Sequence, residues 1–267
     1  MATPSLVERV LGQHIWHLAR PGRRPTNIRG RLTVDSTGPV IILGMHRSGT
    51  SALAGSLQQC GLYLGEVQEQ SPHNPKGNRE NREIMHLNNA VLAANGGSWD
   101  KPPKSVLWNT EHRKLRDDLI AHYPADRAWG FKDPRTVLVL DGWLEALPDA
   151  RMIGTFRHPW AVTASLRKRM PGLAEAACLE MWRVYNQCLL DVVDRDSCKL
   201  VCFDVGPSDY VAAVSRLAME LGLKTCAPNG FHDPGLVSSN QAVDDRPLPD
   251  AVSAIYSALT EYMERNG

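Results

Sequence analysis

"VIILGMHRSGTSALAGSLQQCG", residues 40–61, is the stretch from which the fold of this 267-residue chain can be read. Its first part continues an apolar run that begins at Pro39, as is typical of a strand buried on both faces of a sheet. Gly44 ends that run. From Thr50 onward the apolar residues recur at helical spacing, and Gly61 is a suitable residue to end a helix. The stretch therefore predicts a strand, a glycine-framed loop and a helix.

The loop is similar to a nucleotide-binding loop, Gly-x-x-x-x-Gly-Lys-Ser/Thr, but Thr50 stands where the lysine belongs. That lysine serves the β- and γ-phosphates of a nucleoside triphosphate, so its absence argues against ATP hydrolysis and kinase chemistry. Backbone N–H groups at a helix start can still hold a single phosphate group. A tight turn without a ligand is the competing interpretation. The candidate anion-binding residues are Arg47, Ser48, Gly49, Thr50 and Ser51.

Short apolar runs at residues 128–135, 150–159 and 199–204 alternate with helical patterns, one of which is predicted as a single helix over residues 136–147. Strands separated by helices predict an α/β fold with a central parallel sheet and helices on both faces, a three-layer fold of the P-loop type. Functional residues of such sheets gather at the carboxyl ends of the strands. We therefore expect "GMHRSGTS", "KDPR" and "FRHP" to converge.

Arg157 and Ser165 form a second candidate site. Arg157 ends a predicted strand, and Ser165 lies eight residues later, about two turns into the next helix. A guanidinium group with a nearby hydroxyl suits a terminal phosphate. Alone, the two residues would be an ordinary surface pair, and the loop at residues 44–51 gives them their interest.

The rest of the chain sets limits on the function. Residues 1–35 predict an amphipathic helix and a linker, and residues 36–267 a single α/β domain. The net charge of +1 gives no argument for binding nucleic acid. No stretch is apolar and long enough to be a signal peptide or a membrane span. Because the six cysteines contain no Cys-x-x-Cys pair, we expect buried free thiols, no metal site and a cytoplasmic protein.

Two motifs in this order resemble the sulfotransferases that use 3′-phosphoadenosine-5′-phosphosulfate (PAPS). "GMHRSGTS" is similar to their 5′-phosphosulfate loop, and "RHPWAVTAS" to their 3′-phosphate motif with its Arg and Ser. "NPKGN", "GGSWDKPP" and "FKDPR" are similar to the bacterial branch. The resemblance runs from about Pro39 to Asp204. It implies PAPS as co-substrate, 3′-phosphoadenosine-5′-phosphate (PAP) as product, and no metal.

The resemblance also implies catalytic roles. Lys132, in a Lys-Asp-Pro motif shared with tyrosylprotein sulfotransferases, and Arg47 would carry positive charge to the group in transfer. A lysine that merely pairs with Asp133 is the competing interpretation. Glu80 is predicted as the general base that takes the proton of the acceptor. Asn78 and Arg79 stand just before it, where the family usually has two aromatic residues. Three other residues remain candidates for the base: Glu66, Glu83 and His86.

The resemblance implies an acceptor hydroxyl or amine. A glycan, a lipid, a small molecule and a tyrosyl peptide are all open, as is a homodimer. Trp99, between glycines and prolines, is the best candidate to line its pocket. Two other functions compete: a nucleotide kinase or phosphotransferase, and a nucleotide-binding module without catalysis.

Overall fold

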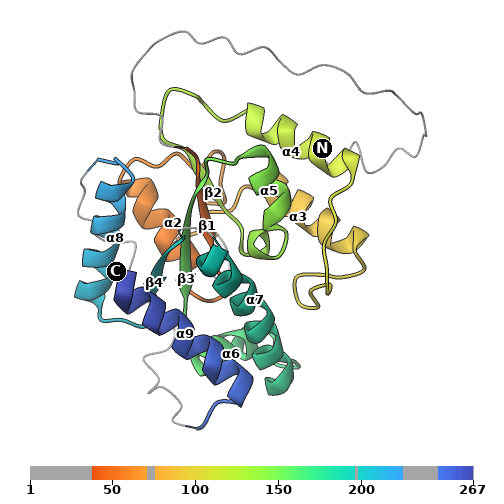
Figure 1. Ribbon diagram of the computed structural model, residues 1–267, viewed down its shortest axis with the longest axis vertical. Coiled ribbons are helices and arrows are strands. Elements are labelled where there is room, and N and C mark those ends of the chain that lie inside the picture. Colours follow the sequence, from red (N-terminus) through yellow and green to blue (C-terminus); the bar gives the residue numbers. More distant parts are fainter. Residues whose placement is uncertain (1–37, 71–75, 196–197, 225–245, 267) are drawn as a thin grey trace.

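The computed structural model describes residues 38–70, 76–195, 198–224 and 246–266 (Figure 1). The predicted helix and linker at residues 1–35 lie outside them. At the centre is a four-stranded sheet in the order β2-β1-β3-β4, with every pair parallel. The predicted fold class, α/β with a central parallel sheet, is confirmed.

The strands are short and lie where the apolar runs predict them. They are β1 (Val40–Leu43), β2 (Gly130–Lys132), β3 (Arg151–Phe156) and β4 (Cys198–Cys202). In register, Val40 of β1 lies between Gly130 of β2 and Arg151 of β3. The central strand is therefore β1, and the loop that follows it leaves the sheet at the middle of its carboxyl edge.

Helices cover both faces of the sheet, as Figure 1 shows with α2 and α8 on one side and α7 on the other. The helical elements are α2 (Thr50–Gln59), α3 (Arg82–Ala94), α4 (Thr110–Ala121), the 3₁₀ turn η1 (Pro134–Leu138), α5 (Leu140–Ala146), α6 (Pro159–Arg169), α7 (Glu175–Arg195), α8 (Pro207–Glu220) and α9 (Asp250–Asn266).

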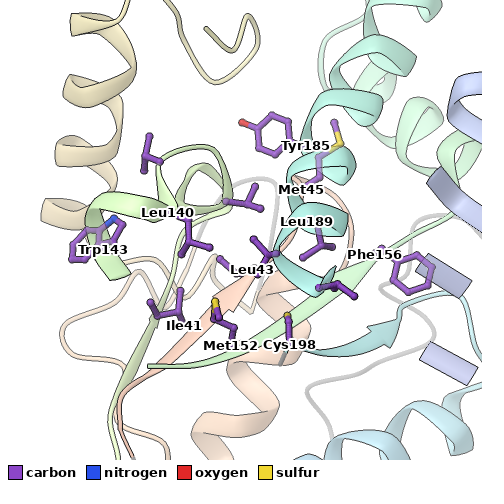
Figure 2. Close-up of a cluster of buried hydrophobic side chains, with 14 of the residues drawn as sticks. Ile41, Leu43, Met45, Leu140, Trp143, Met152, Phe156, Tyr185, Leu189 and Cys198 are labelled. Atoms are coloured by element: carbon purple, nitrogen blue, oxygen red, sulfur yellow. The ribbon is translucent and has the colours of Figure 1, made fainter. Parts of the chain in front are cut away.

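Alternating strand residues feed two separate hydrophobic clusters. Val40 and Ile42 of β1 pack with α2 and α8, whereas Ile41 and Leu43 pack toward α3, α5 and α7. Figure 2 shows the second cluster, with Ile41 and Leu43 beside residues of α5 and α7. Because successive strand residues point to opposite faces, a fully apolar β1 is what a sheet covered on both sides requires.

The expectation of one helix over residues 136–147 is wrong. Pro134 opens the 3₁₀ turn η1, and α5 begins only at Leu140. Between them Val139 has φ −124°, outside helical geometry. Its carbonyl accepts a hydrogen bond from the Trp108 indole at 3.1 Å, a tertiary contact that the local sequence does not reveal.

The expectation of free thiols holds for Cys178, Cys188, Cys198 and Cys202, and is wrong for Cys60, which is disulfide-bonded. The four free thiols are wholly or partly buried. Burial raises the pKa of Cys188 and Cys202 to about 11, so both are unreactive thiols at neutral pH.

Candidate active site

The loop from Gly44 to Ser51 leaves β1 in a conformation that favours glycine. Gly49, the residue before α2, has φ +86°, and a Cβ atom there would lie 2.2 Å from the Phe203 ring. Its position thus admits no larger residue without movement. Among the described residues no side chain caps the start of α2, so the partial positive charge of its first backbone N–H groups is not offset by a capping oxygen. The hydroxyl of Ser48 is buried and has no partner among the described residues.

The loop at residues 44–51 and the pair of Arg157 and Ser165, the two candidate phosphate sites of the sequence, lie together in the structure. The Arg47 Nε donates to Ser165 Oγ at 2.8 Å, across 118 residues of sequence. Arg157 reaches the same loop, since its guanidinium lies 3.4 Å from the Arg47 carbonyl oxygen. Arg47, Arg157 and Ser165 therefore form one cluster at the carboxyl ends of β1 and β3, as expected.

Asp204, just after β4, holds Arg157 in place. Its Oδ1 lies 3.0 Å from Arg157 Nε, and its Oδ2 accepts from the His158 backbone N–H at 2.6 Å. Arg157 also lies over the Phe203 ring, 5.2 Å from its centroid. One carboxylate thus orients a guanidinium and the start of α6 together.

Positive charge exceeds negative charge around this cluster. Neither Arg47 nor Arg169 forms an ion pair with any carboxylate in the described part of the chain. Burial, then Arg169 and then Arg157, lowers the pKa of Arg47. Guanidinium groups that repel one another in a partly buried site favour an anionic ligand.

Lys132, the last residue of β2, supplies the cation that the loop lacks. Its side chain is 1% exposed and its Nζ lies 2.7 Å from Glu80 Oε1. The same Nζ lies 3.2 Å from Ser51 Oγ and 2.8 Å from the Asn78 carbonyl oxygen. Lys132, Glu80 and Ser51 therefore form one buried cluster beside the start of α2.

The pairing of Lys132 with Asp133 is not observed. Asp133 is fully buried and bonds instead to Arg135 at 2.6 Å and to the Asn88 amide at 2.7 Å. The Trp143 indole donates to the other end of that amide at 2.9 Å. This network anchors η1 to α3 immediately after Lys132, and it leaves the ammonium group to Glu80 and the loop.

Among the candidate bases, Glu80 is the one that contacts Lys132. Glu66 is exposed, and no described contact joins Glu66, Glu83 or His86 to Lys132. Asn78, which replaces an aromatic residue of the family pattern, contributes to the site through its backbone. Its carbonyl oxygen accepts hydrogen bonds from both Ser51 and Lys132. An aromatic side chain is not needed for that contact.

Trp99, the predicted pocket residue, lies next to the loop. Its ring centroid is 4.8 Å from that of His46, and the Tyr185 hydroxyl donates to its carbonyl oxygen at 2.8 Å. Trp108, Trp143, Trp160 and Trp182 are buried, and Trp129 stacks on Tyr123.

Sequence reasoning missed two residues of this region. Asp204 ends the run at 199–204, so the rule on carboxyl ends of strands could have found it. His46 lies inside the quoted loop, but nothing in the local pattern shows which way its ring points.

The described residues contain no cluster of three or more His, Cys, Asp or Glu side chains placed to hold a metal ion. Within the same residues, no helix has the length and apolar character of a membrane span.

Comparisons with solved structures agree with this architecture. The "Sulfotransferase Domain from the Synechococcus PCC 7002 Olefin Synthase" is 17% identical, with a TM-score of 0.54 over 87% of this chain and 98% of that one. The "Sulfotransferase Domain from the Curacin Biosynthetic Pathway" is 18% identical, with a TM-score of 0.50 over 84% of this chain and 97% of that one. At these identities the likeness concerns the fold alone.

A search of curated proteins gives no significant match. A family model described as "Sulfotransferase family" matches residues 39–212, which include β1, the loop, Lys132, Arg157 and Ser165. With that match over more than half of its length, the chain belongs to the sulfotransferase family.

Proposed function

We propose that this sulfotransferase moves a sulfuryl group from PAPS to a hydroxyl or amine of a glycan, a lipid or a small molecule. The observation that carries the proposal is the meeting of two cation clusters at the loop of residues 44–51. Lys132 contacts Ser51 at 3.2 Å, and Arg47 contacts Ser165 at 2.8 Å. The proposal keeps the expectation that no metal takes part.

The donor site fits a ligand with two separate anionic groups. At one end, the phosphosulfate would meet Lys132, the start of α2 and the Ser48 hydroxyl. Neither that helix start nor that hydroxyl has a side-chain partner within the described part of the chain. At the other, Arg157 and Ser165 suit the 3′-phosphate, with Asp204 orienting the guanidinium. Arg47 belongs to the loop and contacts Ser165, so it would contact either group.

Charge stabilisation is the main contribution of the protein in this proposal. Sulfuryl transfer to an attacking oxygen places negative charge on the leaving phosphate oxygen, and a fixed cation beside that oxygen stabilises the transition state. Lys132 is buried and held by Glu80, Ser51 and Asn78, so its ammonium needs little reorganisation. Arg47 provides a second cation from within the loop.

Glu80 has two roles to fill. Its Oε1 neutralises Lys132 in the buried cluster. As general base, the carboxylate would take the proton of the acceptor as the new S–O bond forms. The family resemblance and the contact with Lys132 both support Glu80 over Glu66, Glu83 and His86.

Isothermal calorimetry with PAP and with ATP, each with and without EDTA, tests the donor. We expect PAP to bind more tightly than ATP and EDTA to leave that binding unchanged. Tighter binding of ATP with Mg²⁺ would favour a nucleotide kinase, and PAP binding without turnover of PAPS in any extract would favour a non-catalytic module. Incubation of radiolabelled PAPS with a cell extract then identifies the sulfated acceptor. Fractionation of the cells shows whether the enzyme is in the cytoplasm, as expected.

A further inference from the structure

His46 occupies a position that the proposed chemistry above does not use. It lies at the carboxyl end of β1, one residue before Arg47. Its ring packs against Trp99 at 4.8 Å and edge-on against Tyr185 at 5.9 Å. In Figure 2 the side chains of Leu43 and Met45 lead from the core toward Tyr185, which marks this end of the cluster.

The Nε2 atom of His46 is buried and has no hydrogen-bond partner within the described residues. A buried imidazole nitrogen without a hydrogen-bond partner costs the protein free energy. Because this one lies beside the proposed reacting groups, we expect a bound ligand to supply its missing partner. His112 also has an unpartnered buried nitrogen, Nδ1, but it packs on Trp108 from α4. Position, and not burial alone, distinguishes His46.

Positive charges from several elements lie near enough to act on His46. Burial, and then the positive charges of Arg135 in η1, Lys132 in β2, Arg169 in α6 and Arg47 in the loop, hold the pKa of His46 well below its usual range. The ring is therefore neutral at pH 7, with one N–H donor and one lone pair. A neutral imidazole can donate one hydrogen bond to a hydroxyl oxygen, whereas an imidazolium would repel the cations around it.

We infer that His46 positions the acceptor, with Nε2–H donating a hydrogen bond to the oxygen of the attacking hydroxyl, whose own proton goes to Glu80, and the Trp99 indole forming one wall of its site. This inference rests on the proposed function. The Tyr185 hydroxyl fixes the wall by its 2.8 Å bond to the Trp99 carbonyl oxygen. The hydroxyl oxygen then has one lone pair bonded to His46 and keeps its second lone pair for the attack on the group that the loop holds.

The same geometry indicates the class of acceptor. A neutral imidazole and an indole ring offer a polar contact without charge and an apolar surface beside it. We expect a hydroxyl borne on a partly apolar scaffold.

The test compares His46→Leu, His46→Gln and the matched control His112→Leu. Two measurements are made on each: PAP affinity by calorimetry, and cleavage of PAPS by water, which takes the acceptor's place. Loss of one neutral hydrogen bond in the transition state predicts a fall in cleavage of about 2- to 13-fold for His46→Leu. His46→Gln, whose amide can reach the position of Nε2, should retain most of the rate. PAP affinity should stay within about twofold in all three variants, because the proposed hydrogen bond is made to the acceptor and not to the nucleotide.

The control separates packing from positioning. His112→Leu removes a similar buried ring and should change melting temperature without changing cleavage. If His46→Leu cleaves PAPS at the wild-type rate, or loses PAP affinity as much as it loses rate, the inference is wrong and the proposed function survives. If wild-type protein binds no PAP, the proposed function itself fails, and the inference fails with it.

Discussion

The buried pair of Lys132 and Glu80 allows stability and catalysis to be separated by a double-mutant cycle. With 2.7 Å between Nζ and Oε1, their attraction is roughly 6 kcal/mol at an effective dielectric constant of about 20, before desolvation is subtracted. Removing one partner of a buried pair generally costs about 3–5 kcal/mol, because the other charge is left without a counter-ion. We therefore expect Lys132→Met and Glu80→Gln each to lower the free energy of unfolding by an amount of that order.

The double variant Lys132→Met/Glu80→Gln removes both charges and should recover most of that stability, since well-packed uncharged residues often replace a buried pair at little cost. Turnover should follow a different pattern. Loss of a preorganised cation predicts a fall of about 100- to 1,000-fold in Lys132→Met, and loss of a base predicts about 100-fold or more in Glu80→Gln. The double variant should stay inactive although it is stable.

Urea denaturation measures the first quantity and PAPS turnover on the identified acceptor measures the second, with PAP calorimetry as a check that the donor site is intact. Full activity in Lys132→Met would refute the reasoning, and Arg47 would then have to carry the charge alone. Recovery of turnover in the double variant would mean that the single changes acted through folding. If Glu80→Gln keeps wild-type turnover and Glu66→Gln or His86→Ala does not, the base is misassigned and the assignment of Lys132 stands.

Other consequences of the structure are open to direct measurement. Arg157→Ala should weaken PAP binding by about 1.5–3 kcal/mol, roughly 10- to 150-fold, while adenosine 5′-phosphosulfate, which lacks the 3′-phosphate, should bind variant and wild type alike; a large difference with that truncated donor would remove Arg157 from its role. Gly49→Ala should lower both melting temperature and PAP affinity, because its Cβ atom would lie 2.2 Å from the Phe203 ring and its backbone would be strained at φ +86°. Adding Phe203→Ala should relieve the clash but not the backbone strain; an unchanged melting temperature in Gly49→Ala would contradict this. The pKa values of His46 and His112 are lowered in the folded protein, so the unfolded chain binds more protons below about pH 6.5, and stability present at pH 7 should fall as the pH drops, by up to about 1.4 kcal/mol per pH unit for each ring. The free energy of unfolding, measured by urea denaturation between pH 7.5 and 5, should depend less steeply on pH in His112→Leu than in wild type. An equal pH dependence in both would exclude the His112 ring as a source.

Residues 40–61 were sufficient to predict the strand, the loop and the helix, because apolar periodicity and glycine positions are local properties of the chain. The alternation of such units then predicted the parallel sheet, since parallel strands need a crossover between them. From that sheet followed the convergence of Arg47, Arg157 and Ser165, which the bond of 2.8 Å between Arg47 and Ser165 confirms.

Only the tertiary structure decided which charges meet. The sequence allowed Lys132 to pair with its neighbour Asp133, but the fold gives Asp133 to Arg135 and Lys132 to Glu80, 52 residues away. It also ended η1 at Leu138, just before Val139, whose carbonyl accepts a hydrogen bond from Trp108 of another segment. It placed the His46 ring against Trp99 and Tyr185. Ion pairs and ring contacts of this kind depend on the directions of side chains from distant segments, and those directions are fixed only when the sheet and its helices pack.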